Sequence, residues 1–144
     1  VKETLGVSSV LYTAIDAEGH EAYIIEGMNL EDIANRRKFA AFQFELGGTW
    51  AERDPRKARP SWTQTQTARF LSELQYDLYL IGDYYIRVEP DFFEPGFAAV
   101  LDEGFGHFVR GNLLALHRAF AHPTLLQLVR SRQLRPRPDL CQAT

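Results

Sequence analysis

A chain of 144 residues, of which 45% are hydrophobic and 24% are charged, has a globular composition and can bury a core without a disulfide or a metal. This composition excludes an intrinsically disordered chain, and apolar runs of only a few residues exclude a membrane-spanning helix. The formal net charge of −3 argues against binding to nucleic acids through overall charge.

The single cysteine and the N-terminal residues indicate a cytoplasmic protein. Cys141 has no second cysteine with which to form an internal disulfide, as is usual in a reducing compartment. Residues 1–6 lack the long apolar segment of a secretory signal. We predict one domain over residues 1–144, in which residues 135–144 form a flexible tail.

The N-terminal part predicts a hairpin followed by a helix. Segments 7–15 and 21–26 have the composition of strands, and the polar loop between them contains Gly19. Asn29 is then placed as the N-cap of a helix that ends near Lys38. The three cations at residues 36–38 would lie in its last turn, where the helix dipole favours them.

A second hairpin is predicted around a pair of glycines. Segment 42–46 alternates strictly, the glycines at 47 and 48 follow, and segment 49–53 resumes the strand pattern. The alternative continues the preceding helix to Leu46 and ends it at Gly47. Segment 54–60, which begins with Asp-Pro and ends with proline, is predicted to be a loop.

The next helix begins near Ser61 or Thr63, and either Ser61 with Gln64 or Thr63 with Gln66 forms a capping box. A third hairpin is predicted over 76–88, the densest run of β-branched, aromatic and large apolar residues, with a two-residue turn at Gly82-Asp83. The alternative is one helix over 63–81 that ends at Gly82. The predicted hairpin pairs Ile81 with Tyr84 and Tyr79 with Ile86.

Beyond a turn-rich connector at 89–96, the chain is predicted to be helical. A short helix covers 97–103, and a second covers 105–120, because its apolar residues recur at steps of four, four, three and four. Pro123 then stands at the first position of a last helix that ends near Gln133. The inward residues of that last helix are Leu125, Leu126 and Val129.

These elements predict an α+β fold. Its antiparallel sheet is built from two or three hairpins and is covered by helices, including a C-terminal helical segment. A doubly wound nucleotide-binding fold is disfavoured, because strands do not alternate singly with helices and no glycine-rich phosphate loop occurs.

Charged and aromatic residues supply the candidate binding sites. Acidic residues prevail in 1–35 and arginines in 105–144, so a basic region of this acidic protein could bind an acidic partner. The alternative is a solvated surface for the charges and a role of the tryptophans as core or interface anchors. The candidate binding residues are Arg56, Lys57, Arg59, Arg130, Arg132, Tyr79, Tyr84, Tyr85, Trp50 and Trp62.

The sequence contains no convincing catalytic motif, and we expect no metal and no cofactor. Glu103, His107, His117 and His122 lie near one another in the sequence, but glycines at 104 and 106 interrupt the first pair. We predict a non-enzymatic regulatory or partner-binding protein, a homodimer that contacts an acidic partner through its Arg-rich C-terminal region. One alternative is a small-ligand-binding protein or small enzyme with an aromatic-lined pocket. The other is a nucleic-acid-binding regulator, in which helices 105–120 and 124–133 resemble a helix-turn-helix.

Overall fold

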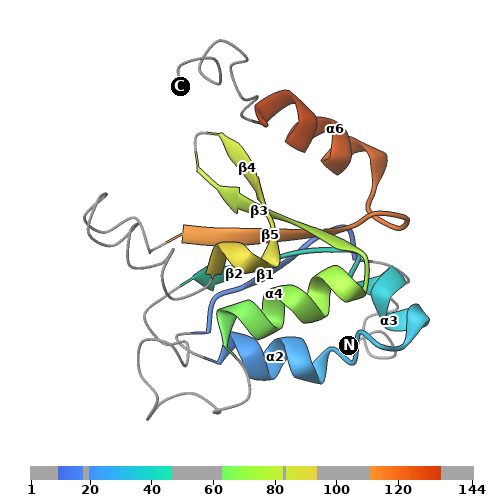
Figure 1. The fold of residues 1–144 in the computed structure, drawn as a ribbon. Helices are drawn as coiled ribbons and strands as arrows, with labels where there is room; N and C mark the ends of the chain where they lie inside the picture. Colours follow the sequence, from blue (N-terminus) through green and yellow to red (C-terminus); the bar gives the residue numbers. More distant parts are fainter. Residues whose placement is uncertain (1–9, 18–19, 47–62, 83, 94–110, 134–144) are drawn as a thin grey trace.

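The computed structural model describes residues 10–17, 20–46, 63–82, 84–93 and 111–133. These residues form a five-stranded mixed sheet, with α2 and α4 on one side and α6 on the other (Figure 1), so the predicted α+β class is confirmed. In spatial order, the strands are β1 (Thr13–Ile15), β2 (Ala41–Leu46), β5 (Gly111–His117), β3 (Tyr76–Ile81) and β4 (Tyr85–Val88). The helices are α2 (Glu21–Gly27), α3 (Ile33–Lys38), α4 (Gln64–Glu73), the 3-10 turn η1 (Pro90–Phe93) and α6 (Pro123–Arg132).

The central strand, β5, occupies a segment for which the sequence predicts a helix. β5 pairs antiparallel with β2 on one side and with β3 on the other, and its residues 113–117 are buried. Four consecutive apolar residues at 113–116 suit a strand that is covered on both faces. The apolar stripe of the predicted helix contains only two of the four. The predicted helix over 105–120 is therefore wrong for its described part, and the helix-turn-helix hypothesis loses its first helix.

The first predicted hairpin is also wrong, because segment 21–26 belongs to helix α2. Glu21 and Ile25, which are four residues apart, are buried, while Tyr23 and Ile24 between them are exposed, as expected for a helix. β1 consequently has no hairpin partner. It pairs in parallel with β2, and the connection between the two strands contains α2 and α3.

Helix α3 begins three residues later than predicted. Asp32 is its N-cap, and the backbone N–H of Ala34 donates to the Asp32 carboxylate at 2.8 Å. Asn29 instead has a positive φ of 48°, which places it in the turn before the helix. The predicted end at Lys38 and the cations in the last turn are confirmed.

Strand β2 confirms the strand interpretation of segment 42–46, and the alternative helix to Leu46 is wrong. The second strand of that predicted hairpin, at 49–53, and the loop at 54–60 lie outside the described residues. The capping box of α4 is confirmed in both directions. The N–H of Gln66 donates to Thr63 Oγ1 at 3.1 Å, and the N–H of Thr63 donates to Gln66 Oε1 at 2.9 Å.

The third hairpin forms, in a register shifted by one residue. Helix α4 ends at Glu73, so the alternative helix over 63–81 is wrong, and Gln75 turns the chain into β3 with a φ of 69°. Three residues separate Ile81 from its partner Tyr85, whereas the prediction assumed a two-residue turn. Tyr79 therefore lies opposite Arg87 instead of Ile86, and Ile81 opposite Tyr85 instead of Tyr84.

The sheet separates two apolar cores. The larger core lies between the sheet and the helices α2 and α4, and its fully buried side chains include Ile25, Phe42, Leu71 and Leu113. The smaller core lies between the sheet and α6. Pro123 at the start of α6 and the inward position of Val129, with Leu125 and Leu126 partly buried beside it, confirm the prediction for the last helix. Within the described ranges, no helix is long and apolar enough to cross a bilayer.

Candidate binding surfaces

An apolar groove of about 340 Å³ lies on the α6 side of the sheet, and we call it the α6 groove. Its aliphatic walls come mainly from α6, and its floor comes from the central strands. The volume falls within the range of small-molecule sites, roughly 300–1,000 Å³. The lining residues are Tyr12, Gln43, Ile81, Tyr85, Leu114, Leu125, Leu128 and Val129.

The register of the sheet explains why these residues meet. Cross-strand pairing places Ala14, Gln43, Leu114, Tyr79 and Arg87 in one row across all five strands. Cross-strand partners point to the same face, so the whole row lies on the α6 side. Helix α6 covers only the middle of the row, where Leu114 and Tyr79 are buried, and Ala14 at the β1 end is exposed. The α6 groove lies between α6 and the part of this row that contains Gln43 and Leu114.

The β1 end of the groove carries hydrogen-bonding groups. The hydroxyl of Tyr12 donates to Oε1 of Gln43, and Tyr85 lines the same groove. Burial, and secondarily the nearby Tyr85, raise the pKa of Tyr12 above its ordinary value of 10.0. The phenol therefore stays protonated at neutral pH and remains a hydrogen-bond donor.

Two cations stand at the end of α6. Arg130 and Arg132 lie in its last turn and are exposed. Burial, and secondarily Asp77, raise the pKa of Tyr79, and Arg130 is among the cations that oppose this rise. Within the described residues, neither arginine forms an ion pair with a carboxylate.

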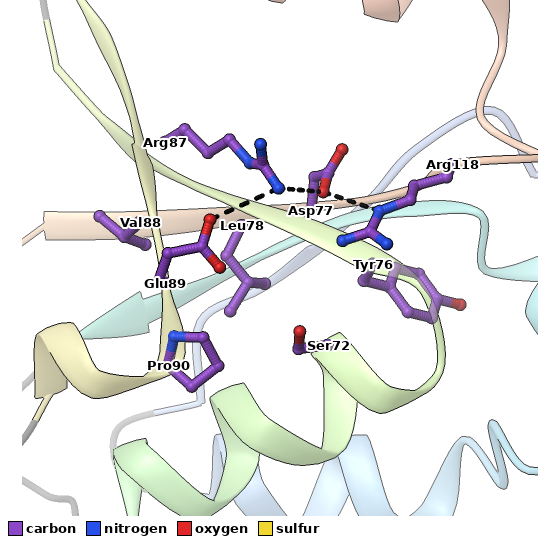
Figure 2. Close-up of a pocket in the computed structure, with 9 residues that line it drawn as sticks. All are labelled: Ser72, Tyr76, Asp77, Leu78, Arg87, Val88, Glu89, Pro90 and Arg118. Atoms are coloured by element: carbon purple, nitrogen blue, oxygen red, sulfur yellow. Dashed lines mark hydrogen bonds and ion pairs between the residues drawn. The ribbon is translucent and has the colours of Figure 1, made fainter.

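A separate charged cluster connects the ends of β3, β4 and the segment after β5. Asp77 accepts a hydrogen bond from Arg87 at 3.1 Å and one from Arg118 at 2.9 Å, and Arg87 also reaches Glu89 at 3.4 Å (Figure 2). The space beside the cluster has a volume of about 10 Å³, enough for about one water molecule. Two carboxylates balance two guanidinium groups, so the cluster fits a structural role better than an anion site.

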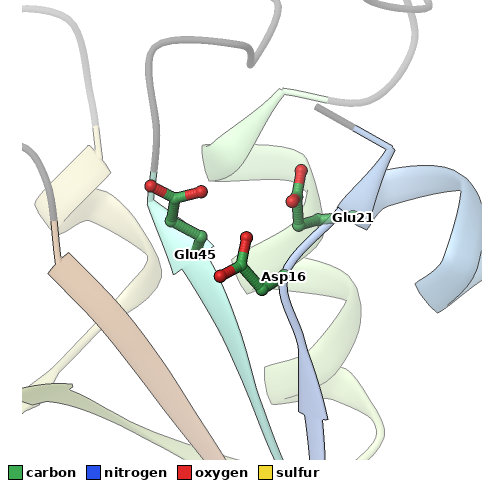
Figure 3. A group of neighbouring side chains, drawn as sticks. All are labelled: Asp16, Glu21 and Glu45. Atoms are coloured by element: carbon green, nitrogen blue, oxygen red, sulfur yellow. The ribbon is translucent and has the colours of Figure 1, made fainter. Parts of the chain in front are cut away.

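Three carboxylates form a second cluster, at the carboxyl ends of β1 and β2 and the start of α2 (Figure 3). Asp16, Glu21 and Glu45 place one oxygen each within 4.8 Å of one another. Glu21 is buried and accepts a hydrogen bond from the N–H of Ala17 at 2.8 Å. Oxygen ligands of this kind suit hard cations, and ligands of open α/β sheets bind outside the carboxyl ends of parallel strands.

Sequence reasoning missed this acidic cluster, because it treated residues 21–26 as the partner strand of β1. The available signal was the position of Asp16 directly after an apolar strand, with Glu21 five residues later. The parallel pairing that brings Glu45 to the same edge has no local signature.

The histidines considered as metal ligands have structural roles where they are described. His117 is buried between the rings of Tyr76 and Phe120. His122 is the N-cap of α6, and its Nδ1 accepts a hydrogen bond from the N–H of Thr124 at 3.3 Å. Glu103 and His107 lie outside the described residues.

The predicted binding residues divide into three groups. Tyr79, Tyr85 and Arg130 lie on or close to the α6 side, and Tyr85 lines the groove. Arg132 lies two residues after Arg130, in the same last turn of α6, and Tyr84 is 61% exposed beside the hairpin turn. The predicted residues that lie outside the described ranges are Arg56, Lys57, Arg59, Trp50 and Trp62.

No family model, no curated protein and no solved structure matches this chain. The chemistry of the surfaces described above is therefore the basis for assigning a function.

Proposed function

We propose that this protein is a non-enzymatic partner-binding protein that holds an amphipathic, acidic polypeptide segment along α6. The observation that carries this proposal is the position of an apolar groove on the same helix as two exposed arginines without carboxylate partners among the described residues. The partner supplies apolar side chains to the groove and carboxylates to Arg130 and Arg132.

The apolar part of the contact supplies most of the affinity. Leu128 on the groove wall is 44% exposed, and Tyr12 at the opposite end is 38% exposed, so both side chains have apolar surface left to bury. Burial contributes about 25 cal/mol for each Å² of apolar surface removed from water. Tyrosine is also enriched among the residues that dominate binding energies in interfaces.

The arginines set the charge preference of the contact. Their guanidinium groups form charge-assisted hydrogen bonds with carboxylates, and charges at the rim of an interface mainly affect association rates and partner choice. Binding should therefore weaken as salt is added, since exposed charges are screened over about 8 Å at physiological ionic strength.

A pair of synthetic peptides tests the proposal. One short peptide alternates glutamate and leucine, the other alternates lysine and leucine, and both carry a fluorophore for anisotropy measurements. We expect the glutamate peptide to bind more tightly than the lysine peptide, and Leu128→Asp and Arg130→Glu each to weaken its binding several-fold. Equal binding of both peptides, or binding unchanged by Leu128→Asp, would contradict the proposal.

Matched controls use exposed residues of the same type elsewhere. Ile33 lies at the start of α3 and Arg69 lies on α4, on the other side of the sheet. Ile33→Asp and Arg69→Glu should leave binding of the glutamate peptide unchanged.

A second candidate function is supported by the polar end of the groove. The paired Tyr12 and Gln43 side chains lie beside aliphatic walls, which suits a small apolar molecule with one hydrogen-bonding group. N-phenyl-1-naphthylamine is a suitable probe, because its fluorescence increases in apolar surroundings. We expect saturable binding that Leu114→Asn lowers if the groove holds small molecules, while binding without saturation would exclude this function.

A further inference from the structure

The two outer strands of the sheet differ in how their free edges are protected. At the β4 edge, Arg87 adds a charge, Pro90 follows soon after the strand, and Tyr85 forms a bridge with Gln133 at the end of α6. Charges, prolines and covering segments are the usual means by which natural proteins prevent an edge from pairing with another chain.

Among the described residues, the β1 edge is protected differently, by the short length of a three-residue strand and by the charge of Asp16 directly after it. Residues 10–16 read Val-Leu-Tyr-Thr-Ala-Ile-Asp, without lysine, arginine or proline, and no described residue pairs with the outer edge of β1. Leu11 is 59% exposed beside this edge. β1 is also parallel to β2, and parallel strands normally lie inside a sheet with both faces covered. An apolar edge with which no described residue pairs is a template for a further strand.

We infer that a second copy of this chain pairs its β1 antiparallel with this edge, about a two-fold axis at Ala14. A two-fold interface uses the same surface on both copies, and Ala14 is the midpoint of β1. This register places Ala14 opposite Ala14, Thr13 opposite Ile15, and Tyr12 opposite Asp16. The sheets of the two copies then form one continuous sheet.

The sequence of β1 is complementary to itself in this register. Thr13 and Ile15 are β-branched residues, which suit a pleated sheet surface, and they lie on the side of the sheet that α2 and α4 cover. On the α6 side, the two small Ala14 side chains meet at the axis without a clash. The phenol of Tyr12 faces the carboxylate of Asp16, so no like charges lie directly opposite one another.

The pairing also places Asp16 of the acidic cluster near the second copy. Asp16 directly follows β1, while the hydroxyl of Tyr12 already donates to Gln43 within its own chain. The pairing therefore places the Tyr12 ring, and no second carboxylate, directly opposite Asp16. The two grooves then approach each other across the axis, because Tyr12 also lines the α6 groove.

A charge-swap experiment tests the register directly. Ala14 is exposed, so Ala14→Lys and Ala14→Glu should both leave the fold intact, which circular dichroism verifies. In sedimentation velocity, we expect the wild-type chain to form dimers and each variant alone to dimerise roughly tenfold or more weakly, because like charges meet at the axis. An equal mixture of the two variants should recover the dimer, since the introduced ammonium and carboxylate then face each other.

The control is Ala34→Lys, a change of the same type at an exposed alanine of α3, which should leave dimerisation unchanged. A monomeric wild-type chain would overturn the inference. A dimer that neither variant weakens, or a mixture that stays monomeric, would also overturn it, because residue 14 would then not meet its own copy. These results do not depend on peptide binding at the α6 groove, so the two proposals can fail separately.

Discussion

The imidazole of His117 stacks on the ring of Phe120, with 4.3 Å between the ring centroids and 17° between the ring planes. The ring of Tyr76 meets the same imidazole edge-on at 5.0 Å. The N–H of Ala119 donates to Nδ1 of His117 at 3.1 Å, which requires an unprotonated nitrogen there. The site therefore holds a neutral histidine.

The neutral imidazole makes stability depend on pH. Burial, then Arg36 and Arg118, lower the pKa of His117 below its ordinary value of 6.5. The unfolded chain then binds a proton at this histidine more readily than the folded chain does. The contribution of the neutral His117 to the free energy of unfolding is therefore complete above about pH 6.5 and is lost as the pH falls below that value. Urea unfolding at pH 7.5 and pH 5.5 should show a loss of stability in the wild type that is smaller in His117→Phe. Equal losses would contradict this assignment.

The Asp77 cluster should contribute measurably to stability. Asp77→Ala leaves Arg87 and Arg118 next to each other without their shared carboxylate, and we expect a loss of roughly 1 kcal/mol, since both arginines are about half exposed. Denaturant unfolding measures the change, and added salt should reduce it. Asp91→Ala is the control, because the Asp91 side chain in the Arg69 pair is 82% exposed, and its removal should change little.

The capping box of α4 should be worth about 1 kcal/mol of unfolding free energy. Thr63→Ala removes the oxygen that accepts the N–H of Gln66, whereas Thr63→Ser keeps an oxygen at that place. Denaturant unfolding should therefore show a clear loss for the alanine variant and a much smaller one for the serine variant. Similar losses for both variants would show that the methyl group, not the hydroxyl, matters at this position.

Glu21 should stabilise the turn before α2. Glu21→Ala removes the acceptor of the part-buried Ala17 N–H, and we expect a loss of about 1 kcal/mol, the low end of the cost of an unsatisfied donor. Glu21→Gln retains an oxygen acceptor and removes one charge from the acidic cluster, so it should cost less. Thermal unfolding of the two variants separates the hydrogen bond from the charge, and a larger loss for Glu21→Gln would contradict this role.

Features that depend on neighbouring residues could be predicted from the sequence. The Thr63–Gln66 box, the turn after Ile81 and the start of α6 at Pro123 each involve groups within a few residues of one another. The hairpin register was wrong by one residue, because the sequence does not specify how many residues the turn contains.

Long-range pairing could not be predicted in the same way. Four apolar residues at 113–116 fit a helix or a doubly covered strand, and only their contacts with β2 and β3 decide between these. The α6 groove shows the same limit. Tyr85 was among the predicted binding residues, but Tyr12, Gln43 and Leu114 belong to three strands that the sheet register brings together.

The position of β5 has a consequence for the order in which the sheet can assemble. Among the described strands, β5 is the last to be synthesised, yet it lies between β2 and β3 in the middle of the sheet. Until residues 111–117 have emerged from the ribosome, β5 cannot pair with β2 and β3, so the pair β1–β2 and the hairpin β3–β4 are not yet joined into one sheet. The edges of β2 and β3 that β5 later joins are unpaired during this time, which favours slow folding and exposes both edges to aggregation.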